Sequence, residues 1–180
     1  MPTYISLLRG INVSGQKSIR MAEITHLYET LALNKVQTYL QSGNIVFESD
    51  EIDGSILVDR IETKIEKSFG FHVAVFIRTQ VDFQRIINLN PFLRDRNEDP
   101  AKLYVTFLYS LPKKELVNRL AAQISEEDKF IPGEKEMYLL CLHGYGKTKL
   151  SNNYFEKKLS VPATTRNWNT INALVKIAQA

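Results

Sequence analysis

Cysteine and histidine are scarce in this sequence, which has one cysteine and three histidines among 180 residues. A single thiol, Cys141, excludes an internal disulfide framework and a thiolate cage for a metal ion. The three histidines, His26, His72 and His143, show none of the short spacings of a metal-binding motif. We therefore expect neither a metal site nor a bound cofactor.

Long apolar runs and strong charge of one sign are also missing. No apolar segment approaches the roughly 20 residues that cross a bilayer, and the first residues lack the basic start and cleavage site of a secretion signal. The formal net charge is only +3, which permits an anionic ligand but is weak for a nucleic-acid-binding protein. The sequence thus predicts a cytoplasmic protein without a membrane segment.

The chain does contain an internal repeat. The segments YISLL (4–8) and YVTFL (104–108) match in character at every position. In each half a strand pattern is followed by a helical stripe, a strand pair, a second helical stripe and a closing strand. The alternative is a chance similarity of alternating patterns. We predict an α+β fold of two tandem ferredoxin-like (split β-α-β) lobes, each with the order β-α-β-β-α-β followed by one extra helix.

The most polar connector, residues 93–102, is the natural boundary between the lobes. The expected organisation is a first lobe over 1–92, a linker over 93–102 and a second lobe over 103–180, packed as one unit. Hairpin turns are expected at Ser42-Gly43-Asn44 and near Pro132-Gly133. Helix starts are expected at three caps: a capping box from Thr79 to Asp82, Ser151, and Thr170.

Arg9 stands on the apolar side of the opening strand and precedes a loop with small polar residues. From position alone, a structural ion pair or a snorkelling side chain is the favoured explanation. The loop shifts that balance toward an anion site, because Gly10 and Gly15 let a ligand approach the backbone and Lys17 lies just before the next helix. The loop is not a Walker A motif, since Gln16 separates Gly15 from Lys17.

TTRNWNT, residues 164–170, is a second polar motif and contains the only tryptophan. Strand alternation places Thr164, Arg166 and Trp168 on one face, which favours stacking or a shared ligand. The alternative is an edge strand whose polar groups block aggregation.

Catalytic signatures are largely absent. Cys141 lies among apolar residues, which is typical of a core thiol rather than a nucleophile. Glu126, Glu127 and Asp128 form an acidic run that we expect to face solvent. No Ser-His-Asp order stands out, so the sequence does not indicate an enzyme.

Several motifs together resemble the bacterial domain-of-unknown-function 1697 family, and the resemblance covers essentially the whole chain. The similar segments are LLRGINVSG (7–15), QSGN (41–44), NPF (90–92), VTFL (105–108), KLS (149–151) and TTRNWNT (164–170). The sequence departs from the family at Ser14, where glycine is usual, and at Gln16, where histidine is common. These departures argue against a strict glycine-loop or histidine mechanism. The resemblance implies a duplicated ferredoxin-like fold and brings no catalytic assignment.

The favoured function is binding of a small anionic or phosphorylated ligand at a polar site between the lobes. The predicted ligand-binding residues are Arg9, Gly10, Asn12, Lys17, Gln41, Ser42, Asn44, Arg166, Asn167 and Trp168. One alternative is RNA or single-stranded nucleic-acid binding, which split β-α-β sheets can perform. The others are an enzyme for a phosphate- or carboxylate-bearing substrate, and an interaction scaffold without a catalytic site. The oligomeric state is not predicted.

Overall fold

Each predicted repeat forms its own four-stranded antiparallel sheet. The structure, a computed structural model, describes residues 1–123 and 127–180 and separates the chain into two compact units. The first unit contains residues 1–85 and 173–180, and the second contains residues 86–172. The boundary therefore falls within two helices, α3 (Gln80–Asn88) and α7 (Trp168–Gln179).

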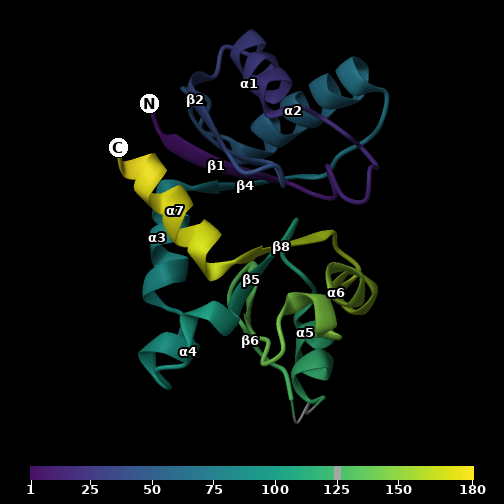
Figure 1. Cartoon of the computed structure of the whole chain (residues 1–180), viewed down its shortest axis with the longest axis vertical. Coiled ribbons are helices and arrows are strands. Elements are labelled where there is room, and N and C mark those ends of the chain that lie inside the picture. Colours follow the sequence, from purple (N-terminus) through teal and green to yellow (C-terminus); the bar gives the residue numbers. More distant parts are fainter. Residues whose placement is uncertain (124–126) are drawn as a thin grey trace. The chain divides into compact units, whose positions relative to one another are not determined.

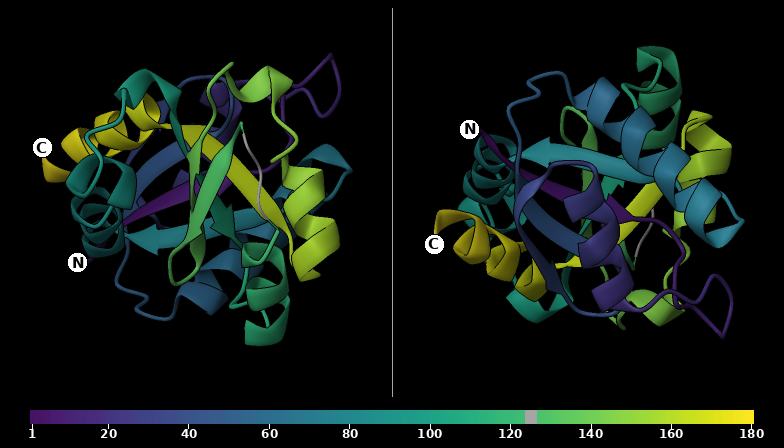
Figure 2. Two further views of the ribbon diagram at one scale, coloured as in Figure 1. Left: turned by 90° about the horizontal axis from the view of Figure 1, so that it is seen from below. Right: turned by 90° about the horizontal axis from the view of Figure 1, so that it is seen from above.

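The first sheet has the strand order β2-β3-β1-β4. Its elements follow the predicted order along the chain: β1 (Thr3–Leu8), α1 (Met21–Thr30), β2 (Asn34–Tyr39), β3 (Asn44–Glu48), α2 (Gly54–Phe69) and β4 (Val75–Thr79). Helices α1 and α2 lie side by side over one face of this sheet (Figure 1; Figure 2, right).

Alternation along the strands builds the core beneath these helices. Tyr4 and Leu8 of β1 point to the helical face, as do Ile45 and Phe47 of β3. The apolar stripes of the two helices meet them with buried Ile24, Leu27, Tyr28, Leu57, Ile61 and Ile65. The spacing of these helical residues is what the sequence pattern predicted.

The second sheet repeats the arrangement in the order β6-β7-β5-β8. Its elements are β5 (Leu103–Leu108), α5 (Lys114–Ala121), β6 (Lys129–Pro132), β7 (Glu136–Leu140), α6 (Asn152–Leu159) and β8 (Ala163–Asn167). Three short helices complete the unit: α4 (Pro91–Arg94), η1 (Pro100–Lys102) and η2 (Tyr145–Lys147). Helices α5 and α6 lie next to each other beside the strands (Figure 2, left).

Two of the predicted helix caps are confirmed. Thr79 and Asp82 form the capping box, since the Thr79 amide donates to Asp82 Oδ2 (2.9 Å) and the Asp82 amide donates to Thr79 Oγ1 (3.1 Å). Ser151 Oγ accepts from the Tyr154 amide (3.2 Å) at the start of α6. No helix in the described ranges has the length and apolarity that crossing a membrane requires.

Candidate functional site

Three connecting segments meet at one end of the first sheet. Strand β1 ends at Leu8, and its antiparallel neighbours β3 and β4 begin beside it. The segments 9–20, 40–43 and 70–74 are therefore brought together. The Leu8 amide donates to the carbonyl of Gly43 (2.8 Å) and closes part of this junction. We call these three segments the loop cluster.

The side chain of Asn12 holds the loop cluster together. Its Nδ2 donates to the carbonyl oxygens of Ile19 (2.9 Å) and Gln41 (2.8 Å), and its Oδ1 accepts from the Ile19 amide (2.8 Å). One half-buried amide thus bridges two segments that lie almost 30 residues apart in sequence. Because both ends of the amide are engaged, Asn12 positions the loop.

Left-handed backbone is frequent in the loop cluster. The residues concerned are Gly10, Asn12, Ser14, Gly15, Lys17, Leu40 and Gly43, with φ values between 46° and 83°. A non-glycine residue in this region costs about 1–2 kcal/mol. Such a conformation persists only when surrounding contacts determine it, and the hydrogen bonds of Asn12 are among those contacts.

The opening and hairpin motifs fit closely against each other at Gly43. A Cβ at this position would lie 2.8 Å from both Ile11 Cδ1 and Leu8 Cβ. The next residue, Asn44, is buried, and its Nδ2 donates to the Tyr39 carbonyl (2.7 Å) and to Ser42 Oγ (2.9 Å). The hairpin therefore depends on a glycine and an asparagine for steric and hydrogen-bonding reasons.

The loop cluster carries cations and no carboxylate. Its sequence includes Arg9, Lys17 and Arg20, and neither Asp nor Glu occurs in any of its three segments. Lys17 Nζ donates to the His72 carbonyl (2.8 Å), which ties the long segment to the segment before β4. The result is an exposed polar surface whose fixed charges favour an anion.

The structure places seven of the predicted ligand-binding residues in or directly beside the loop cluster: Arg9, Gly10, Asn12, Lys17, Gln41, Ser42 and Asn44. The other three, Arg166, Asn167 and Trp168, belong to the second unit.

The closing motif does not continue as a strand through Trp168, as its alternation had predicted. Strand β8 ends at Asn167, and Trp168 is the first residue of α7 and only 6% exposed. The predicted cap at Thr170 is also wrong. Asn167 Oδ1 accepts from the Thr170 amide (2.8 Å), so Asn167 is the cap and Thr170 supplies the capped N–H.

Arg166 is buried beside two hydrogen-bond acceptors of its own strand. Its Nη1 donates to Thr164 Oγ1 (2.8 Å) and to the Thr165 carbonyl (3.0 Å). Burial lowers the pKa of Arg166 to about 10, because desolvation disfavours the charged guanidinium.

Arg78 occupies the equivalent place in the first unit and was not among the predicted site residues. Arg78 pairs with Ile5 of β1 as Arg166 pairs with Val105 of β5. Both arginines are buried, and Arg78 Nη1 also donates to the carbonyl of the preceding residue, Ile77 (2.9 Å). The available signal was that each arginine stands two residues before the first residue of the helix that follows its closing strand.

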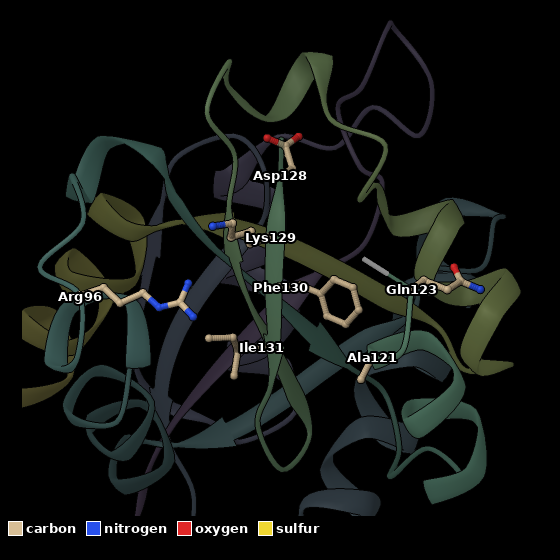
Figure 3. A pocket seen from close by; sticks show the side chains of 7 residues that line it. All are labelled: Arg96, Ala121, Gln123, Asp128, Lys129, Phe130 and Ile131. Carbon is tan, nitrogen blue, oxygen red and sulfur yellow. The ribbon is translucent and has the colours of Figure 1, made fainter. Parts of the chain in front are cut away.

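A hollow of about 240 Å³ lies along the edge strand β6 of the second unit. Phe130 and Gln123 lie on one side of the strand, and Ile131 and Arg96 lie on the other (Figure 3). Two cations, Arg96 and Lys129, and one carboxylate, Asp128, line this hollow. 

Asp128, another residue that lines the hollow, accepts a hydrogen bond from the Leu142 amide (2.9 Å). In the acidic run to which it belongs, Glu127 is exposed and Asp128 is half-buried, while Glu126 lies outside the described residues.

The environment of the one cysteine disfavours nucleophilic chemistry. Cys141 is buried, and burial raises the pKa of its thiol to about 11, so the thiolate is scarce at neutral pH. Within residues 1–123 and 127–180, no group of three or more His, Cys, Asp or Glu side chains is placed to hold a metal ion.

Comparison with known proteins agrees with this fold. The chain is similar to the conserved bacterial protein SP0830 from Streptococcus pneumoniae, a solved structure with a TM-score of 0.78, 22% sequence identity and 98% coverage of each chain. No protein with a curated description matches the chain. A family model described as "Protein of unknown function (DUF1697)" matches residues 1–138. The chain therefore belongs to the DUF1697 family, whose function is unknown.

Proposed function

We propose that the protein binds a small anionic or phosphorylated ligand and that the loop cluster of the first unit supplies the binding residues. One observation carries the proposal: Asn12 ties together segments that contain three cations and no carboxylate. A site that is held in shape before binding loses less entropy when the ligand arrives.

The backbone of the loop cluster is accessible to such a ligand. A Cβ at Gly10 or at Gly15 would meet no atom within 4 Å, so both positions face open space. Arg9 and Lys17 supply a planar fork and a point charge, which are the two common ways of binding phosphate. Gln41 and Ser42 are exposed at the turn and can add neutral hydrogen bonds.

The roles of the predicted residues divide accordingly. Arg9, Lys17, Gln41 and Ser42 contact the ligand directly in this proposal, and Asn12 positions them. A ligand-binding role for Arg166, Asn167 and Trp168 stays a prediction. We also propose that each unit is a ferredoxin-like lobe, which its element order and strand order support.

Thermal-shift screening tests the binding proposal. The panel contains inorganic phosphate, ribose 5-phosphate, AMP, succinate and a short single-stranded RNA. A ligand present at a hundredfold its Kd adds about 2.7 kcal/mol of stability, which is several degrees for a chain of this size. We expect the shift in the wild type to be lost in Arg9→Gln and in Lys17→Gln. It should persist in Lys113→Gln, which removes an exposed lysine of the second unit.

Two results would contradict the proposal. One is a panel in which no anion shifts the wild type. The other is a shift that survives both loop-cluster variants. A response to RNA alone that disappears steeply with added salt would favour nucleic-acid binding instead.

A further inference from the structure

A larger hollow lies in the first unit, between helices α1 and α2, and has a volume of about 540 Å³. Its lining comes from one face of each helix: Ala22, Glu23, His26, Leu27 and Thr30 of α1, and Lys64, Ser68 and Phe69 of α2, with Arg20 at the start of α1. Residues three and four apart share a helix face, so this set forms one continuous surface. We call it the α1–α2 cleft.

Two of the side chains that line the cleft are small, namely those of Ala22 and Ser68. The floor is apolar, since Leu27 is buried and Phe69 is half-buried. A concave surface of this volume falls within the usual range of about 300–1,000 Å³ for small-molecule sites.

The charges in the cleft are predominantly basic. Two cations, Arg20 and Lys64, line it against a single carboxylate, Glu23, and the imidazole of His26 lies among them. That carboxylate is already engaged, because Glu23 Oε2 accepts a hydrogen bond from the Arg20 amide (3.2 Å). Among the described residues, none forms a hydrogen bond or an ion pair with the side-chain nitrogens of Arg20, His26 or Lys64.

We propose that the α1–α2 cleft is a binding site for a small organic anion with a flat apolar body. The carboxylate, sulfonate or phosphate group of the ligand lies at the cations, and its body covers Leu27 and Phe69. An aromatic face and an aliphatic side chain bind a flat ring, whereas a bare inorganic anion gains nothing from them. This site goes beyond the proposed function of the loop cluster and shares only Arg20 with it.

The fluorescent anion 8-anilinonaphthalene-1-sulfonate is a suitable probe, since it combines a sulfonate with flat aromatic rings. The intact wild-type chain should bind one equivalent. Lys64→Gln should weaken binding about tenfold, the value of one charge-assisted hydrogen bond. Lys67→Gln is the matched control, because Lys67 is an exposed lysine of the same helix that does not line the cleft. Ser68→Leu fills the cleft without changing its charge and should abolish binding.

The neutral probe N-phenyl-1-naphthylamine isolates the contribution of the anionic group, and we expect it to bind at least tenfold more weakly. The inference is overturned if Lys64→Gln and Lys67→Gln behave alike, if both probes bind equally, or if the wild type binds no sulfonate probe. Arg9→Gln separates the two sites. Loss of probe binding in Arg9→Gln but not in Lys64→Gln would place the probe at the loop cluster and refute the cleft.

Discussion

At the scale of single residues, asparagine side chains stabilise several places where the chain leaves regular structure. Asn12 bridges two loop segments, Asn44 closes the first hairpin, and Asn167 caps a helix. An asparagine side chain has both a donor and an acceptor, so it can satisfy backbone groups where the chain leaves regular structure. These polar motif residues fix turns, and the proposed ligand contacts come from their charged and exposed neighbours.

A comparison of alanine substitutions at Gly43 and Gly15 separates the cost of steric overlap from the cost of backbone strain. Both have positive φ, but only Gly43 packs against neighbouring side chains. We expect Gly43→Ala to lower the free energy of unfolding by about 2–4 kcal/mol, which combines left-handed strain with overpacking. Gly15→Ala should cost only about 1 kcal/mol. Urea unfolding of both variants measures the difference, and equal losses would contradict the close fit at Gly43.

Cys141 makes stability depend on pH in the alkaline range. Its thiol has a pKa of about 11 in the folded chain, above the ordinary value of 9.0, so the unfolded chain releases this proton first. The wild type should therefore lose stability relative to Cys141→Ala as pH rises from about 8 to about 10.5, by roughly 2 kcal/mol. Urea unfolding at the two pH values gives this difference. Parallel losses in both proteins would show that the thiol does not contribute.

At the scale of elements, each closing strand passes directly into a helix. Strand β4 ends at Thr79 and α3 begins at Gln80, while β8 ends at Asn167 and α7 begins at Trp168. The side chain of the last strand residue caps the helix in both cases. No loop residues are needed, because the cap turns the chain and satisfies a free N–H in one step.

The cap at Asn167 can be tested directly, since this residue is exposed. We expect Asn167→Ala to lower the free energy of unfolding by about 1 kcal/mol. Asn167→Asp keeps the acceptor and should cost much less. Thermal unfolding monitored by circular dichroism provides the comparison. If the aspartate and alanine variants lose the same stability, the hydrogen bond to the Thr170 amide is not what starts α7.

Sequence patterns over neighbouring residues predicted most of these elements. Contacts between segments that lie far apart in the sequence were harder to predict. The stripes of α1 and α2 and the turn at Ser42-Gly43-Asn44 depend on neighbouring residues, so they can be read from a sequence. The bridge from Asn12 to Gln41 depends on which loops share an end of the sheet. The α1–α2 cleft depends on which helix faces are adjacent and on two small residues between them. The start of α7 was missed because TTRNWNT continues a strand-like alternation past Asn167.

At the scale of the whole molecule, the two halves have the same strand register and differ in the length of one connecting segment. Tyr4 pairs with Thr79 as Tyr104 pairs with Asn167, so the strand registers coincide. The connection between the first strand and first helix differs strongly, covering residues 9–20 in one unit and only 109–113 in the other. The loop cluster is thus specific to the first half of the repeat, which is why we place the ligand there.

The buried arginines are the polar feature that both halves share. We expect Arg78→Met and Arg166→Met each to lower the free energy of unfolding by about 1–3 kcal/mol, because each change removes the donor from acceptors that are buried or partly buried. Arg119→Met, at an exposed position of α5, is the control and should change stability by less than about 0.5 kcal/mol. Chemical denaturation tests this set. A neutral effect at Arg78 combined with a loss at Arg166 would show that the repeat preserved the residue but not its role.

The return of residues 173–180 to the first unit has a consequence for biosynthesis. Leu174 and Val175 are buried, and Gln179 Nε2 donates to Gln84 Oε1 (3.0 Å), so this late segment is part of the first unit's structure. During translation, residues 1–85 leave the ribosome long before their partner segment is made. The second unit is continuous over residues 86–172, whereas the first unit becomes complete only after residues 173–180 have been synthesised.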